Sequence, residues 1–548
     1  MSWITLVLTV LAMQSAPADL VIENARIWSD GLVGFAEFAG IRNGRFVYVG
    51  PRQPDLIGDE TEVVDAEGRV VIPGLIDSHI HMLGGGIQLQ RLGLRDVVDR
   101  AEFVDSVARQ AATLDQDAWI LGGRWSTESW MDPRPPTRAW VDGVSDGHPL
   151  LLTRMDGHSA LANTTALKIA GITADGPPDP PGGIIDRDPD TGEPTGILRD
   201  AAIGLVSRHV PAMTLQQQVD ALVRATREAR SHGITAVSDI PSLQDLPAYA
   251  RLAEIGPGIR FYLYVTADDF AEALRQMRAF PQVTDRVEIR GFKTYLDGSM
   301  GSRTAYMRDP FLGNDPLRPD WSGLLREGVG EGGLVRKLDI AREAGLQPIA
   351  HAIGDEANHM LLDALEQVYG DDLAAARCRA EHVQHLLPED IDRYGALGVI
   401  ASMQPLHKAD DGRYAESYIG THRARSSYAY KSLLDTGAVL VFGSDWPVVS
   451  LNPFLGIQAA VTGRILDGTT WQTQENITVA EALRCYTSRA AWAMRNEDDL
   501  GRIAPGYLAD FVILEQSPFA PEVQWEHVRP FRVYIGGSAD ARPLRPAG

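Results

Sequence analysis

Cysteine is nearly absent from this chain: only Cys378 and Cys485 occur among 548 residues. The two lie far apart and match no zinc or redox spacing, so we expect buried thiols and no disulfide framework. Positive charge is also scarce, because 51 Lys and Arg residues stand against 73 Asp and Glu residues, a net charge of −22. This balance argues against nucleic acids and anionic membrane surfaces as main partners. A glycine triplet at 84–86 lacks the following Lys-Ser/Thr of a phosphate-binding loop.

Long apolar runs are missing as well. The run from Ile4 to Met13 is about ten residues long, too short to span a bilayer. Ala16-Pro17-Ala18 then gives the small-x-small pattern of a cleavage site, although no Lys or Arg precedes the apolar run. We interpret residues 1–18 as a signal peptide and expect a periplasmic or extracellular protein. An uncleaved N-terminal anchor is the alternative, and no later segment is long and apolar enough to be transmembrane.

The strand-like and helix-like patterns predict a central barrel enclosed by the two chain ends. Short strand patterns near both termini indicate a small composite β domain made of residues 19–70 and 500–548. Between them, strand-like runs alternate with helical patterns, which favours parallel βαβ units. Eight candidate strands match the number in a TIM (β/α)8 barrel over residues 71–499. These runs are 71–78, 234–239, 260–266, 288–295, 347–351, 379–384, 398–403 and 438–443. Two further candidates, 118–124 and 149–155, fall in a segment that we interpret as an insertion or cap over 83–215.

Six residues of metal-ligand type fall near the carboxyl ends of these strands, where barrel enzymes build their sites. His79 and His81 alternate onto the same side of the first strand and form half of a metal site. The others, in chain order, are Lys293, His351, His382 and Asp445. Taken alone, Lys293 is more typical of a salt bridge and His382 of a core histidine, but the joint pattern favours a metal centre. An ammonium repels a cation, so Lys293 fits only as an anionic carbamate formed with CO2. Zn²⁺ suits such a histidine-rich set, although metal availability also decides.

The motifs that carry these residues resemble the amidohydrolase superfamily, in its YtcJ-like amidohydrolase family 3 branch, which includes N-substituted formamide deformylases. The matching phrases include PGLIDSHIHM, GFKTYLDGSMGSRTA, HAIGDEA, EHVQ, SMQP, GSDWPV and GRIAPGYLADFVIL, and they cover nearly the whole chain after residue 18. The resemblance implies a metal-dependent TIM barrel with a composite β domain, and hydrolysis of C–N bonds. It also implies two metal ions. His79, His81 and Asp445 would hold one, His351 and His382 the other, and carboxylated Lys293 would bridge them together with a hydroxide.

We therefore expect a metal-dependent amidohydrolase that cleaves a non-peptide amide bond of a small N-acyl or N-formyl amine. The bridging hydroxide would attack the carbonyl carbon, and Asp445 would pass its proton to the leaving nitrogen. An esterase or lactonase, a cyclic-amide hydrolase or a mononuclear variant would use the same site, and a non-catalytic barrel is the remaining alternative.

Other residues carry weaker expectations. His158, Asp297 and Arg303 are candidates for substrate contact, and Arg303 suits a substrate carboxylate. Glu381, beside His382, should alternate to the opposite face and serve structure. His407 receives no role, and the oligomeric state is open, with a homodimer compatible with the sequence.

Overall fold

The computed structural model describes residues 16–95, 97–116, 118–127, 130–154, 159–267, 269–279, 286–314, 319–326, 328–330 and 332–539. The chain divides into two compact units, one made of Met1–Gly84 with Leu222–Gly548 and the other of Gly85–Ala221. The predicted signal peptide lies outside the described residues except for its last three positions. Within the described residues, no helix has both the length and the apolar character needed to cross a membrane. Cys378 and Cys485 are both buried free thiols.

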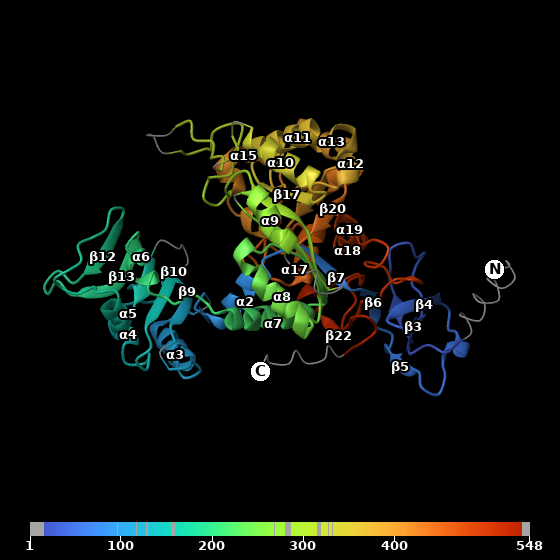
Figure 1. Ribbon diagram of the computed structural model, residues 1–548, viewed down its shortest axis with the longest axis horizontal. Coiled ribbons are helices and arrows are strands. Elements are labelled where there is room, and N and C mark those ends of the chain that lie inside the picture. The colour runs from blue at the N-terminus through green and yellow to red at the C-terminus, as the bar shows by residue number, and fades with distance from the viewer. Residues whose placement is uncertain are drawn as a thin grey trace. The chain divides into compact units, whose positions relative to one another are not determined.

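Eight parallel strands form the barrel of the larger unit, so the predicted fold class is confirmed. Figure 1 labels three of them, β7, β17 and β20. In sheet order they are β20 (Leu440–Phe442), β19 (Ile400–Met403), β18 (Arg379–His382), β17 (Gln347–Ala352), β16 (Val287–Tyr295), β15 (Arg260–Thr266), β14 (Ile234–Asp239) and β7 (Leu75–Ile80). Their runs of Val, Ile, Leu and Phe are buried, as expected for strands covered on both faces. Strands that follow one another in sequence pair in parallel from β7 through β20, which brings all eight carboxyl ends to one rim.

Helices connect these strands and cover the barrel, as the alternating pattern predicted. They are α7 (Leu215–Ser231), α8 (Leu246–Ile255), α9 (Phe270–Ala279), α10 (Gly333–Glu343), α11 (Asp355–Tyr369), α12 (Leu373–Ala376), α13 (Pro388–Leu397), α14 (Pro405–Asp411), α15 (Ala415–Ala424), α16 (Tyr430–Asp435), α17 (Pro453–Thr462), α18 (Val479–Cys485) and α19 (Ser488–Ala493). Short 3-10 turns are η1 (Pro54–Leu56), η2 (Leu243–Asp245), η3 (Gly370–Asp372), η4 (Thr473–Glu475) and η5 (Trp525–His527). Leu361 and Leu365 lie four residues apart on one face of α11, and both pack into the apolar layer around the sheet.

Two strands replace the single strand that the sequence predicted over 71–78. β6 (Val70–Pro73) joins a sheet of the chain ends, whereas β7 begins the barrel at Leu75. Gly74 separates them, and a Cβ atom there would lie 2.2 Å from the Thr235 hydroxyl oxygen. The continuous apolar run concealed this break, because residues buried in either sheet are apolar alike.

Two small sheets of the larger unit are built from the chain ends, the first from N-terminal strands and the second from strands of both ends. One sheet has the order β4-β3-β1-β5, with β1 (Leu20–Glu23), β3 (Phe38–Arg42), β4 (Arg45–Gly50) and β5 (Glu62–Asp65). The other has the order β2-β6-β21-β22, with β2 (Arg26–Ile27), β21 (Phe511–Leu514) and β22 (Pro530–Tyr534). Phe46 and Phe511 share one core with Ile27, so N-terminal and C-terminal strands are packed together.

The smaller unit has its own sheet, in the order β12-β13-β11-β10-β9-β8. Its strands are β8 (Leu92–Gly93), β9 (Ile120–Trp125), β10 (Leu150–Arg154), β11 (Ser159–Ala162), β12 (Gly183–Arg187) and β13 (Pro194–Asp200). Its helices are α3 (Arg100–Ala111), α4 (Arg138–Val141), α5 (Thr164–Ile169) and α6 (Ile203–Ser207), and α2 (Met82–Gln90) leads into it. The unit covers Gly85–Ala221, where the sequence indicated an insertion over 83–215. Both strands expected within that insertion are present, and they pair in parallel.

Candidate metal centre

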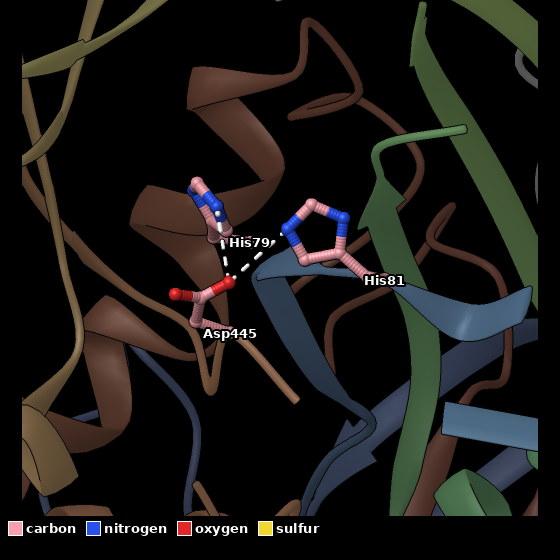
Figure 2. A group of neighbouring side chains, drawn as sticks. All are labelled: His79, His81 and Asp445. Carbon is pink, nitrogen blue, oxygen red and sulfur yellow. Dashed lines mark ion pairs between the residues drawn. The ribbon is translucent and has the colours of Figure 1, made fainter. Parts of the chain in front are cut away.

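Three of the predicted ligands meet at the rim of the barrel, between its first and last strands. Figure 2 shows His79, His81 and Asp445 turned toward one another, with one carboxylate oxygen facing both rings. That oxygen, Oδ1 of Asp445, lies 3.5 Å from His79 Nε2 and 3.2 Å from His81 Nε2. Two imidazole nitrogens and one carboxylate oxygen converging on a point are suitable for a divalent cation.

Backbone contacts between β7 and the segment after β20 hold this group together. The Asp445 N–H donates to the His79 carbonyl at 2.7 Å, and the His81 N–H donates to the Trp446 carbonyl at 2.9 Å. A Cβ atom at Gly443 would lie 2.5 Å from the His79 nitrogen, so only glycine permits this approach. Asp445 itself has a φ of +57°, a left-handed conformation that a non-glycine residue adopts at a cost.

The Asp77 side chain also links the same two segments by hydrogen bonds. Its Oδ1 accepts hydrogen bonds from the Ser444 N–H at 3.0 Å and the His79 N–H at 3.1 Å. Burial raises the pKa of this carboxyl group to about 7. Asp77 is therefore a positioning group for the backbone that carries two of the predicted metal ligands.

His351 and His382 complete a continuous group of imidazoles. The ring centroid of His382 lies 4.7 Å from that of His79 and 4.4 Å from that of His351. They come from the ends of β17 and β18, which are neighbours in the barrel. The structure thus brings the four predicted histidines together across strands that are far apart in sequence.

One ring nitrogen of each of these histidines is held by a protein oxygen. The pairs are His79 Nδ1 with Glu381 Oε2, His81 Nδ1 with the Ile240 carbonyl at 3.3 Å, His351 Nε2 with the Gly298 carbonyl at 2.9 Å and His382 Nδ1 with Gln404 Oε1 at 2.7 Å. An acceptor on one nitrogen keeps the proton there and leaves a lone pair on the other. Burial also lowers the pKa of His79 to about 4, so this ring stays neutral. Metal-binding histidines need this arrangement.

Lys293 has the environment that a carbamate requires. The side chain is completely buried in β16, and its Nζ has no hydrogen-bond partner within the described residues. Burial lowers the pKa of the ammonium to about 8. A buried ammonium without a hydrogen bond is costly, whereas addition of CO2 would give an anion able to bind cations. The buried amine without a hydrogen bond and the oriented imidazoles therefore fit a metal centre.

Glu381 faces the metal ligands, contrary to the sequence-based interpretation. Its Oε2 contacts His79 Nδ1, and its Oε1 accepts a hydrogen bond from Arg379 Nε at 2.8 Å. Burial would raise the pKa of Glu381, but Arg379 and His79 hold it well below its usual range. Strand alternation failed as a guide because His382 has a φ of +79° and leaves the β conformation at this position.

Replacing Glu381 with Gln should weaken metal binding, because His79 loses its anionic partner and the buried Arg379 loses its counter-ion. We expect a loss of metal affinity of about 10- to 100-fold, measured by titration of metal-free protein with Zn²⁺ and a competing chelator. Glu389→Gln is the matched control, since Glu389 makes an exposed ion pair with Arg308. Equal affinities in both variants would contradict the positioning role of Glu381.

The candidates for substrate contact are placed differently. Asp297 is completely buried and accepts hydrogen bonds from the N–H groups of Tyr306, Ile353 and Gly354. It also lies 3.2 Å from His351 Nε2, so its observed contacts orient a metal ligand. Arg303 lies over the Tyr418 ring and donates to the carbonyls of Leu312 and Gly313. His158 lies outside the described residues. Substrate contact by these three residues stays a prediction.

His407 joins the site, although sequence reasoning gave it no role. It lies in α14, directly after β19, and its Nε2 is 3.6 Å from Asp445 Oδ2. Together with His382 and Asp445 it forms a second group whose ligand-type atoms lie within 4.8 Å of one another. The only signal in the sequence was its place after the seventh barrel strand, where rim residues are expected.

A parallel barrel with oriented histidines, a buried lysine and a carboxylate on its carboxyl rim defines a class of metal-dependent hydrolases. Comparison with known proteins agrees: the sequence profile of the amidohydrolase family matches residues 62–537. This chain belongs to the amidohydrolase family.

Individual relatives extend over most of the chain. It is 37% identical to "Protein LONG AFTER FAR-RED 3" of Arabidopsis thaliana, over 95% of this chain and 91% of that protein. Identity is 31% to a putative amidohydrolase, YtcJ, of Bacillus subtilis, over 84% and 87% of the two chains. It is 24% to an N-substituted formamide deformylase of Arthrobacter pascens, over 95% and 97%. A solved structure of an uncharacterized metal-dependent hydrolase from Pyrococcus furiosus superposes with a TM-score of 0.74 at 26% identity, covering 91% of this chain and 100% of that one.

Proposed function

We propose that this metal-dependent hydrolase uses two divalent ions, most suitably Zn²⁺, to cleave the amide C–N bond of a small N-acyl or N-formyl amine. The observation that carries the proposal is the buried Lys293 amine, which has no hydrogen bond within the described residues, together with four oriented histidines and Asp445. The N-substituted formamide deformylase among the relatives supports the choice of an amide. A single-metal site would not need a carbamate on Lys293.

The ligands divide into two sets. His79, His81 and Asp445 would hold one ion, and His351 and His382 the other, with the Lys293 carbamate shared between them. When bound, the ions lower the pKa of water toward neutrality and polarise the substrate carbonyl. The barrel contributes imidazoles whose orientation is set by protein oxygens.

Asp445 is the group that moves the proton in this proposal. Burial would raise its pKa, but the hydrogen bond to His81 and the neighbouring imidazoles hold the pKa well below its usual range. The carboxylate is therefore ionised and can accept a proton from water. It then gives that proton to the leaving nitrogen, which matters because an amine anion is a very poor leaving group.

A hydrolysis panel tests the proposed bond type. The purified protein would be loaded with Zn²⁺ in bicarbonate buffer and offered N-formyl, N-acetyl and aromatic N-acyl amines beside the matched esters, with amine or alcohol release measured. We expect amine release that disappears after chelation and returns with metal. Turnover of the esters alone, or amine release that survives chelation, would overturn the proposed function.

A further inference from the structure

His407 is a buried imidazole whose Nε2 faces the site and forms no hydrogen bond within the described residues. The residue is 9% exposed, and its Nε2 is buried with no hydrogen-bond partner within the described residues. Its ring lies parallel to that of His382, with centroids 5.9 Å apart. The nearest carboxylate oxygen, Asp445 Oδ2, is 3.6 Å from Nε2. A polar atom in such a place needs a partner, because leaving it unpaired costs free energy.

Gln384 sets the tautomer of this ring. The Gln384 amide nitrogen, Nε2, lies 3.1 Å from His407 Nδ1. In this orientation the amide NH2 group donates and Nδ1 accepts, so Nδ1 carries no proton. The geometry then places the ring proton on His407 Nε2, the atom that faces Asp445.

This arrangement is the reverse of that in the four histidines assigned as metal ligands. Each of those has an oxygen acceptor on one nitrogen and a lone pair on the other. His407 instead has the Gln384 donor at Nδ1 and an N–H at Nε2, the nitrogen that faces the site. A protonated nitrogen cannot bind a cation, but it can donate a hydrogen bond to a substrate oxygen beside Asp445.

We propose that His407 is a catalytic residue that donates a hydrogen bond from Nε2 to the acyl oxygen of the substrate as that oxygen gains negative charge. The proposal rests on the proposed hydrolytic function. Addition of the water oxygen to the acyl carbon moves the carbonyl electron pair onto the acyl oxygen. When the carbonyl reforms, the bond to the leaving atom breaks, and that atom takes the proton from Asp445. His407 keeps its own proton throughout, and its hydrogen bond strengthens as the charge develops.

Two variants of His407 distinguish the effect of its N–H group from the effect of its size. His407→Phe keeps a flat ring without an N–H, whereas His407→Gln places an amide N–H near the former Nε2. We expect His407→Phe to lower kcat by about 10²- to 10³-fold with little change in KM, and His407→Gln to recover much of that loss. Each variant should retain the metal content of the wild type. His385→Phe is the matched control, since His385 is also buried with an unpartnered Nε2 but hydrogen bonds to Ser427; it should leave kcat unchanged.

Substrate pairs show which atom receives the hydrogen bond. An anilide and a 4-nitroanilide of the same acyl group differ in their leaving nitrogen but share the acyl oxygen. Donation to the acyl oxygen predicts the same loss in His407→Phe for both. A loss confined to the anilide would overturn the proposal in favour of the leaving group, and a fall in metal content would overturn it in favour of a metal ligand. An unchanged kcat in His407→Phe would also overturn it.

The role of His407 can be tested independently of whether the substrate is an amide or an ester, and also without measuring turnover. If the wild type cleaves only esters, the amide proposal fails, yet a phenyl and a 4-nitrophenyl ester still test His407 because the same oxygen gains charge. Binding of methylphosphonate to zinc-loaded protein, measured by calorimetry, needs no turnover. We expect weaker binding in His407→Phe than in the wild type and in His407→Gln. Equal dissociation constants in all three proteins would count against the donor.

Discussion

Asp445→Asn is expected to retain its metal ions and lose almost all hydrolytic activity. The substitution preserves the size of the side chain and one oxygen that can face His79 and His81, but it removes the proton acceptor. Positioned acid–base catalysis is worth about 10²- to 10⁴-fold, and kcat should fall by that factor. KM should change less, because the proton transfer belongs to the transition state. Steady-state kinetics and metal analysis on the same samples measure both effects.

A surface aspartate provides the comparison for this variant. Asp410 makes an exposed ion pair with Arg413, so Asp410→Asn should behave as the wild type in both assays. Near-normal kcat in Asp445→Asn with full metal content would show that another group moves the proton. A large fall in metal content would instead assign Asp445 mainly to metal binding, and the kinetic loss would then follow from the empty site.

Lys293→Ala is expected to lose one of the two metal ions and most of the activity. The variant removes the amine that would carry the shared carbamate, so the second ion keeps only His351 and His382 as protein ligands. Short carboxylates such as formate or acetate can enter the vacated space and supply an anionic bridge. We therefore expect added acetate to restore part of the metal content and activity of Lys293→Ala, measured by metal analysis after gel filtration and by turnover.

The pH dependence of reactivation provides a second test of Lys293. CO2 reacts with the neutral amine, and burial lowers the pKa of Lys293 in the metal-free protein to about 8. The neutral fraction therefore grows as the pH rises toward 8 and beyond, and bicarbonate-dependent reactivation should accelerate over that range.

Lys408 is the matched control, because it is also fully buried with a pKa near 8 but donates to the Gln472 carbonyl. Full metal content in Lys293→Ala, or its loss in Lys408→Met, would contradict the bridging role.

The barrel and its ligand positions could be predicted because the relevant signals are local. Strand β14 begins and ends at the predicted residues, Ile234 and Asp239, since a short apolar run between turns defines a buried strand. His351 and Asp445 were found the same way, as polar residues at or just beyond strand ends. Parallel strands in consecutive order bring such residues to one rim, so their convergence followed from the topology.

The break at Gly74 was missed, although Pro73-Gly74 is a turn dipeptide, because the apolar run continues on both sides of it. The role of Glu381 was missed for a different reason. Its partner His79 lies 302 residues away, and the alternation rule assumes a β conformation that His382 does not keep.

By itself, the sequence determined the barrel class and the family and predicted a set of metal ligands, because these depend on local periodicity and on motifs at strand ends. Tertiary structure decided which group meets each ring nitrogen of these histidines. Gln404 and Gln384 are both glutamines, yet one presents an oxygen to His382 and the other an NH2 group to His407. One ring is thereby prepared to bind a cation and the other to donate a hydrogen bond. The orientation of an amide depends on all the groups packed around it, so no motif in the chain specifies this difference.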